Sequence, residues 1–272
     1  MLLCLDVGNT HILCGVFDNQ KLITRFRYAT HLIGTADQLG MFLIHILQTN
    51  KISIDQIDGI SVCSVVPSCD YTIRHTFKLY FKADYFLLGA GAKTGLNIKY
   101  KNPKEVGADR IANAIGAINA FPNRNLILVD MGTATTVCAI TKQRDYLGGT
   151  IFPGMRLAME SLKSHTAKLM EVDIELPLTC MGQTTRESIQ AGLYYNQLGT
   201  LKALIHEMKQ EIFNTDDVTV IGTGGFSQLF KSKMIFDVIL PDLVLQGLCQ
   251  AYQYFLQRSE AVIPYKSETK NG

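Results

Sequence analysis

The hydrophobic pattern of the chain alternates short apolar runs with longer stretches of helical periodicity. Apolar runs of strand length lie at 2–5, 11–17, 21–28, 57–66, 85–88, 126–130, 146–152 and 218–221. Apolar residues recur every three or four positions at 37–47, 111–118, 155–162, 198–208 and 243–256. Short runs are typical of strands, and the longer spacing is typical of amphipathic helices. The alternation therefore predicts an α/β protein.

A polar turn interrupts the pattern at the start of the chain. The first apolar run stops at Asp6, Gly8-Asn9 is a turn signal, and a second run begins at His11, which predicts a β-hairpin. Gly8 lets the backbone approach a ligand, so that N–H groups and the Thr10 hydroxyl can bind phosphate. Asp6 can hold Mg²⁺ directly or through water. An ordinary hairpin with turn-forming residues would explain the same sequence.

The same pattern returns 124 residues later, in Leu128–Ile140. Asp130 and Gly132 then repeat Asp6 and Gly8, and the alignment pairs the remaining positions as Asn9 with Thr133, Thr10 with Ala134 and Cys14 with Cys138. Two strands that each end in Asp-x-Gly indicate a duplicated fold. We expect the two turns to face each other across a cleft and to hold one phosphate chain.

The predicted helix at 102–121 carries a third group of candidate functional residues, after the two turns. Asn102-Pro103 is a helix-start signal, and the helix carries Gly107-Ala108-Asp109-Arg110. The two small residues would let a substrate approach closely. Asp109 can accept a proton from a hydroxyl, and Arg110 can bind a carboxylate or phosphate. An exposed, inert charge pair would look the same in the sequence.

The remaining polar breaks and turn signals in the sequence predict two halves. The polar break Phe121–Asn125 places the boundary between residues 1–121 and 122–272, although the last helix can pack back on the first half. Thr184 and Glu187 form a capping-box pattern that opens a helix reaching about Phe213. A glycine loop at 222–225 follows a strand, an arrangement that places a nucleotide on the N-terminus of the next helix. Residues 266–272 are polar and are expected to fray.

The amino-acid composition excludes several classes of protein. The 272 residues are 47% hydrophobic and 18% charged, with a net charge of +2, so nothing indicates nucleic-acid binding or disorder. Seven cysteines without a Cys-x-x-Cys pair favour free thiols in a reducing cytoplasm. No signal peptide, membrane span or zinc spacing is recognisable, so we expect a cytoplasmic protein.

Four motifs in order give the chain a family resemblance. Asp-x-Gly-Asn-Thr at 6–10, Gly-Ala-Asp-Arg at 107–110, Asp-x-Gly-Thr-Ala-Thr-Thr at 130–136 and Thr-Gly-Gly at 223–225 resemble type III pantothenate kinase. The resemblance runs from Leu3 to about Phe255. It implies an actin-like fold of the Hsp70 and sugar-kinase superfamily: duplicated ribonuclease H-like halves, mixed sheets flanked by helices, and an ATP cleft between the halves.

The resemblance also implies roles for individual residues. Asp109 would be the catalytic base, and Asp130 would bind a monovalent cation, K⁺ or NH₄⁺. Asp6 would hold the Mg²⁺ that accompanies ATP, through water. The implied ATP contacts are Asp6, Val7, Gly8, Asn9, Thr10, His11, Ile12, Leu13 and Thr133. The implied pantothenate contacts are Tyr100, Gly107, Ala108, Asp109, Arg110 and Thr185, and the family forms homodimers with the substrate pocket near the subunit interface.

The function implied by the resemblance is ATP-dependent phosphorylation of pantothenate to 4′-phosphopantothenate, the first step of coenzyme A biosynthesis. The motifs alone indicate a phosphotransferase acting on a small hydroxyl compound. Two alternatives stay open: a kinase for another small hydroxyl substrate on the same fold, and a catalytically silent nucleotide-binding regulator. The joint presence of Asp6, Asp109 and Asp130 argues against the regulator, because a silent fold has no chemical need for all three.

Overall fold

The first of two β-sheets comes from the N-terminal part of the chain. The computed structural model describes residues 1–215 and 217–260. The first sheet has the order β3-β2-β1-β4-β5, in which β1 to β3 form an antiparallel meander and β4 and β5 run parallel to β1. Its strands are β1 (Leu2–Val7), β2 (His11–Asp18), β3 (Lys21–Ala29), β4 (Gly59–Ser64) and β5 (Asp84–Leu88).

The second sheet repeats this topology. Its order is β11-β10-β7-β8-β9-β6, with an antiparallel meander from β7 to β9 and with β10 and β11 parallel to β7. Its strands are β7 (Leu126–Met131), β8 (Ala134–Ile140), β9 (Asp145–Pro153), β10 (Thr219–Thr223), β11 (Val238–Ile239) and the short β6 (Asn97–Ile98). The predicted duplication is confirmed. Strand β6, which extends the second sheet beyond β9, was not predicted.

The helices follow the apolar periodicity with three local differences. Pro103 begins a short 3₁₀ helix, and the α-helix carrying Asp109 starts only after Gly107. The helix capped by Thr184 ends at Glu207 and continues as a π-helix to Phe213. A 3₁₀ helix, Ser227–Lys233, follows the glycine loop. The α-helices are α1 (Ala36–Thr49), α2 (Pro67–Tyr80), α3 (Ala108–Ala120), α4 (Met155–His165), α5 (Thr185–Glu207) and α6 (Leu243–Glu260).

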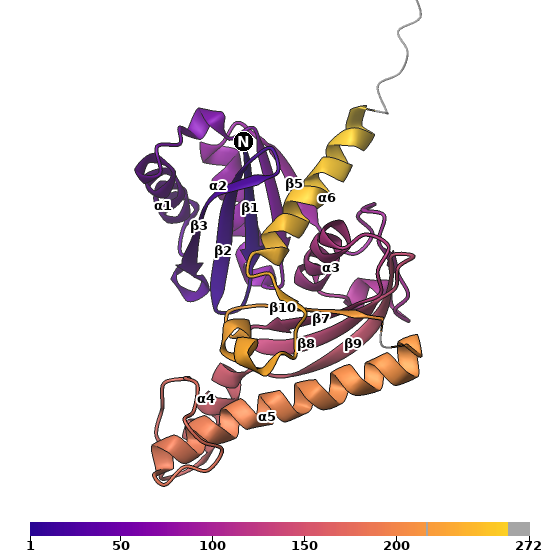
Figure 1. Cartoon of the computed structure of the whole chain (residues 1–272). Coiled ribbons are helices and arrows are strands. Elements are labelled where there is room, and N and C mark those ends of the chain that lie inside the picture. The colour runs from indigo at the N-terminus through magenta and orange to yellow at the C-terminus, as the bar shows by residue number, and fades with distance from the viewer. Residues whose placement is uncertain (216, 261–272) are drawn as a thin grey trace, which may run out of the picture.

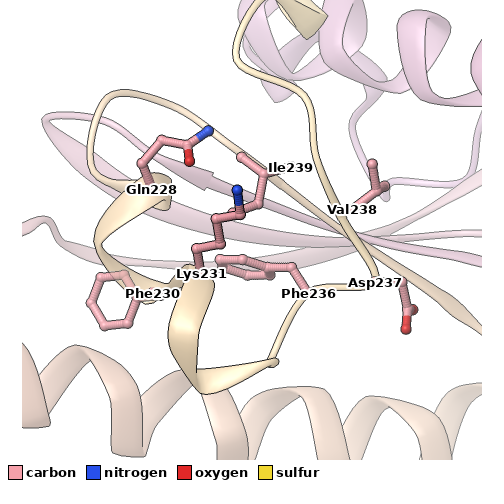
Figure 2. Close-up of a pocket in the computed structure, with 7 residues that line it drawn as sticks. All are labelled: Gln228, Phe230, Lys231, Phe236, Asp237, Val238 and Ile239. Carbon is pink, nitrogen blue, oxygen red and sulfur yellow. The ribbon is translucent and has the colours of Figure 1, made fainter.

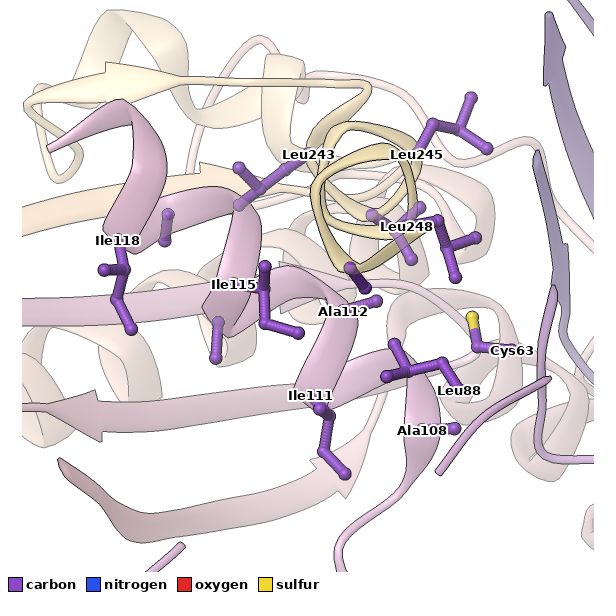
Figure 3. Packing of buried hydrophobic residues seen from close by; sticks show 14 of the residues in the cluster. Cys63, Leu88, Ala108, Ile111, Ala112, Ile115, Ile118, Leu243, Leu245 and Leu248 are labelled. Atoms are coloured by element: carbon purple, nitrogen blue, oxygen red, sulfur yellow. The ribbon is translucent and has the colours of Figure 1, made fainter. Parts of the chain in front are cut away.

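Three apolar layers hold these elements together. Helices α1 and α2 cover the outer face of the first sheet, and α5 covers the outer face of the second (Figure 1). Helices α3 and α6 lie side by side between the two sheets and share one core with both (Figure 1, Figure 3). Helix α6 also packs on β1, β2, β4 and β5, so the end of the described chain returns to the first sheet.

Helices α3 and α6 approach each other backbone to backbone. A methyl group on Gly247 would lie 1.8 Å from the carbonyl oxygen of Ala112, and one on Gly116 would lie 2.6 Å from that of Leu243. Only glycine allows this separation. The contact fixes how the two sheets meet. The division of the chain at residue 121 stays a prediction, and the tail at 266–272 lies outside the described residues.

No helix in the described ranges, 1–215 and 217–260, has both the length and the apolar composition of a membrane span.

Candidate active site

The two duplicated turns meet at their hydroxyl groups. The Oγ1 atoms of Thr10 and Thr133 lie 2.9 Å apart, within hydrogen-bonding distance. Thr30 holds the first turn, because its hydroxyl donates to the carbonyl of Gly8 over 2.6 Å and its N–H donates to that of Thr10 over 3.0 Å. Gly154 holds the second turn, donating its N–H to the carbonyl of Thr133 over 3.0 Å. The expectation that the turns face each other is confirmed.

The alignment of the two turns is wrong by one residue. Four residues separate the last paired residues of β1 and β2, Val7 and Ile12, but only three separate those of β7 and β8. The shorter second turn brings Thr133, and not Ala134, opposite Thr10. It also shifts the register: the residue before Asp6 pairs with Cys14, whereas the residue before Asp130 pairs with Val137. Cys14 therefore corresponds to Val137 and not to Cys138.

Three carboxylates gather beside these turns. Asp6 and Asp130 occupy the ends of equivalent strands, β1 and β7, and Asp109 lies in the first turn of α3. Desolvation, with the charge of Asp109, raises the pKa of both Asp6 and Asp130 to about 7. Desolvation also raises the pKa of Asp109. Three crowded acids repel one another as long as no positive charge lies among them, so their surroundings favour a cation, although no group of three or more acidic, histidine or cysteine side chains within residues 1–215 and 217–260 is arranged to hold a metal ion by itself.

Each carboxylate has its own hydrogen-bond donor. The thiol of Cys63 donates to Oδ1 of Asp6 over 3.3 Å, and the amide of Asn113 donates to Oδ2 of Asp130 over 2.8 Å. The backbone N–H of Arg110 donates to Oδ1 of Asp109 over 2.8 Å. Sequence reasoning missed Cys63 and Asn113. Asn113 left a signal, since it is a polar residue within the apolar run 111–118 of the helix, and Cys63 left none.

Two glycines allow these carboxylates their positions. A methyl group on Gly107 would lie 2.5 Å from Oδ1 of Asp109. Gly224 has a φ of +84°, and a methyl group there would lie 2.5 Å from Oδ1 of Asp130. The glycine loop that follows β10 therefore lies directly against the second turn.

Arg110 is a buried cation enclosed by aromatic rings. Its side chain is only 6% exposed, and its guanidinium carbon lies 5.8 Å from the ring centroid of Tyr100 and 5.6 Å from that of Tyr146. Both distances are typical of cation–π contacts. The Nε and Nη2 atoms have no hydrogen-bond partner within the described chain. Buried N–H groups of this kind suit an anionic ligand. Tyr146 was not predicted as a site residue.

Thr185 lies apart from this cluster. It is the first residue of α5, directly after Thr184, whose capping box with Glu187 is formed as predicted. The N-terminal end of α5 lies beside α4, well away from α3 (Figure 1). A single chain therefore does not bring Thr185 to Asp109.

A cavity of about 200 Å³ lies beyond the glycine loop, between the 3₁₀ helix Ser227–Lys233 and β11 (Figure 2). It contains none of the predicted site residues. The lining residues are Gln228, Phe230, Lys231, Phe236, Asp237, Val238 and Ile239.

Comparison with known proteins identifies the family. The family model of type III pantothenate kinase matches residues 2–207, which include both turns and the three carboxylates. The chain belongs to the type III pantothenate kinase family. Type III pantothenate kinase from Legionella pneumophila strain Paris is 52% identical over 248 residues, covering 91% of this chain and 96% of the relative. Type III pantothenate kinase 1 from Francisella tularensis is 44% identical, with coverage of 91% and 97%.

Family membership makes the chain a phosphotransferase that uses ATP, with a divalent metal ion, to phosphorylate pantothenate in coenzyme A biosynthesis. Solved structures agree on the fold. ROK hexokinase from Thermus thermophilus covers 94% of this chain and 99% of its own at a TM-score of 0.50 and 14% identity. A Campylobacter jejuni protein provisionally placed among Baf family transcriptional activators reaches 0.60 at 17% identity, with coverage of 94% and 99%. These likenesses support the predicted actin-like architecture.

Proposed function

We propose that phosphoryl transfer to pantothenate takes place between the two duplicated turns. The observation that carries the proposal is the contact of Thr10 with Thr133 beside three carboxylates. The hydroxyl groups of both turns and the backbone of residues 6–13 would hold the triphosphate. Asp6 would hold Mg²⁺ through water, because the ion prefers one or two carboxylates together with phosphate oxygens and water.

Asp109 is the proposed general base. Its carboxylate lies at the start of α3, fixed by the N–H of Arg110, and its raised pKa favours accepting a proton. It would orient the primary hydroxyl of pantothenate toward the terminal phosphate and take its proton as the new oxygen–phosphorus bond forms, while the bond from that phosphorus to the bridging oxygen breaks and ADP leaves. Phosphoryl transfer depends mainly on alignment and charge neutralisation, so the base would supply about a 10²- to 10⁴-fold part of the rate.

Arg110 is the proposed anchor for the carboxylate of pantothenate. It is buried, it is held between Tyr100 and Tyr146, and it has N–H groups without a protein partner. A planar guanidinium can bind a carboxylate through two parallel hydrogen bonds. Gly107 and Ala108 would leave room for the substrate beside the helix start. Tyr100 would then contact the substrate through the ring that already faces Arg110.

Asp130 is the proposed ligand of a monovalent cation, K⁺ or NH₄⁺. Asn113 occupies its Oδ2 atom, and Oδ1 faces the backbone of the glycine loop. A carboxylate whose pKa is raised to about 7 by its surroundings gains from a nearby positive charge. A cation held there would offset negative charge close to the phosphates.

A homodimer would complete the substrate site. Large apolar side chains are exposed on α4 and on the segments before and after it, close in the sequence to Thr185: Ile151, Leu157, Leu162, Met170, Leu176, Leu178 and Met181. Exposed apolar surface of this extent commonly marks an interface. We propose that a second copy covers it and presents its own Thr185 to the pantothenate site.

Mixing two inactive variants tests this arrangement. Asp109→Asn and Thr185→Arg are each expected to lower turnover strongly as purified homodimers. In a heterodimer, one site would combine an intact Asp109 from one chain with an intact Thr185 from the other. Random pairing of equal amounts should therefore restore about a quarter of the wild-type turnover per chain. Turnover of the mixture that only equals the mean of the two variants would contradict a shared site.

The activity itself is tested by the release of ADP from MgATP, with and without pantothenate, in K⁺ and in Na⁺ buffers. We expect release that depends on pantothenate and falls when Na⁺ replaces K⁺. Dependence on pantothenate without dependence on the cation would remove the role of Asp130. Equal release with another small hydroxyl compound would indicate a different substrate. Nucleotide binding without release in either salt would favour the regulator.

A further inference from the structure

Exposed basic side chains lie on the elements next to the contact between Thr10 and Thr133. His11 begins β2 directly after the first turn, Arg27 lies on the neighbouring strand β3, and Arg156 lies in the first turn of α4. Desolvation, followed by the charges of Arg27 and Arg156, lowers the pKa of His11, which is consistent with both arginines lying near it. None of these three residues is among the hydrogen-bond donors of Asp6, Asp109 and Asp130 that are described above.

Strand register fixes the direction of Arg27. His11 pairs with Ala29 and Leu13 pairs with Arg27, so Arg27 lies on the same sheet face as His11, one residue pair further along. Leu13, also on that face, packs into the core shared with α3 and α6. The face is therefore the inner one, turned toward the second half of the chain.

The neighbouring arginine on this face is neutralised, but Arg27 is not. Arg25, two residues earlier on β3, forms an ion pair with Asp242 just before α6. Arg27 is exposed and forms no ion pair with any of the described residues. The ion pair with Asp242 gives Arg25 a structural role. The charge of Arg27 has no ion-pair partner among the described residues.

Arg156 approaches the contact from the other side. The residue that caps α4, Gly154, donates its N–H to the carbonyl of Thr133, and a methyl group on it would lie 2.4 Å from the carbonyl oxygen of Gly132. The start of α4 is thus packed tightly on the second turn. Arg156 is exposed there and forms no ion pair within the described ranges. The nearby acid Glu171 pairs with Lys163 over 2.7 Å, and its pKa is lowered first by Lys163 and less by the charge of Arg156.

We propose that Arg27 and Arg156 form a two-sided clamp for the terminal phosphate of the nucleoside triphosphate. The inference rests on the proposed function, since it needs the triphosphate between the two turns. A triphosphate beside three carboxylates needs compensating positive charge, and the buried Arg110 is assigned to the substrate carboxylate. Arginine suits the task because it binds phosphate oxygens through two hydrogen bonds and stabilises charge on the transferring group.

The test compares the binding of two nucleotides by calorimetry in the presence of Mg²⁺. Arg27→Gln and Arg156→Gln should each weaken a non-hydrolysable ATP analogue about tenfold, the loss typical of one charge-assisted contact. Binding of ADP, which lacks the terminal phosphate, should change less than about twofold. Arg25→Gln is the matched control, because it removes the same charge from the same strand face, and it should bind both nucleotides as the wild type does.

Three outcomes would overturn the clamp. Wild-type affinity for the analogue in Arg27→Gln or in Arg156→Gln would show that the replaced arginine is not part of the clamp. Equal weakening of ADP and the analogue would place the arginines on the inner phosphates. Weakening by Arg25→Gln to the same extent would show a general effect of surface charge. Failure of the proposed function looks different, since the wild type itself would then not bind the analogue or turn over pantothenate. Melting curves check that each variant is folded.

Discussion

Replacing Asp109 by Asn is expected to lower kcat at least about a hundredfold while ATP and pantothenate still bind. Asparagine keeps the shape of the side chain and can accept the hydrogen bond from the N–H of Arg110, but it cannot take a proton from the substrate hydroxyl. The change also removes one charge from the carboxylate cluster, so nucleotide affinity should not fall. Steady-state kinetics gives kcat, and calorimetry gives the two affinities.

The control for this variant is Asp55→Asn, a change of the same kind in the 3₁₀ helix Ile54–Gln56, which contacts Met1 at the end of β1 opposite to Asp6. It should leave kcat and both affinities at wild-type values. Near-normal turnover in Asp109→Asn would remove Asp109 from the role of base. Loss of pantothenate binding in that variant would instead assign it to substrate positioning.

Replacing Gly247 by Ala is expected to destabilise the ligand-free protein by about 3 kcal/mol, at the upper end of overpacking effects. The new methyl group would lie 1.8 Å from the carbonyl oxygen of Ala112. Because that atom belongs to the backbone of α3, relief requires the two helices to separate. Their separation would disturb the core shared by both sheets. Urea denaturation of the two proteins measures the difference.

Gly199→Ala provides the matched control. Gly199 lies within α5, and a methyl group there would meet nothing within 4 Å. Alanine favours the helix over glycine, so this variant should be more stable than the wild type by about 0.5–1 kcal/mol. An unchanged stability of Gly247→Ala would mean that α3 and α6 can move apart at little cost.

The sequence predicted most of the strands and helices because their burial is periodic. Strands such as β1 and β7 are short apolar runs that end at an aspartate, and Thr184 with Glu187 marks the start of α5 by a local hydrogen-bond pattern. Strand β6 escaped prediction, since it has two residues and exists only by pairing with β9. Apolar runs and capping patterns predict where a strand or helix begins, but they do not predict which strand it pairs with.

The site was predictable to the extent that its residues occur in motifs. Asp6, Asp109 and Asp130 come together from three motifs far apart in the sequence. Their donors Cys63 and Asn113 belong to strand and helix interiors, where packing alone explains most residue types. The contact between Thr10 and Thr133 depends on the second turn being one residue shorter than the first. The comparison of the two motifs missed this difference because it aligned them without a gap.

The return of α6 to the first sheet constrains how the chain folds during synthesis. The inner face of that sheet includes Leu2, Cys4 and Cys63, which are buried in the core that α6 completes. Tyr252 of α6 fills the space beside Gly59, where a methyl group would lie 2.4 Å from its hydroxyl oxygen. A ribosome has to make some 190 further residues after Cys63 before this face can be covered. The amino-terminal sheet therefore emerges with an apolar surface exposed and completes its folding only when the carboxyl-terminal helix has left the exit tunnel.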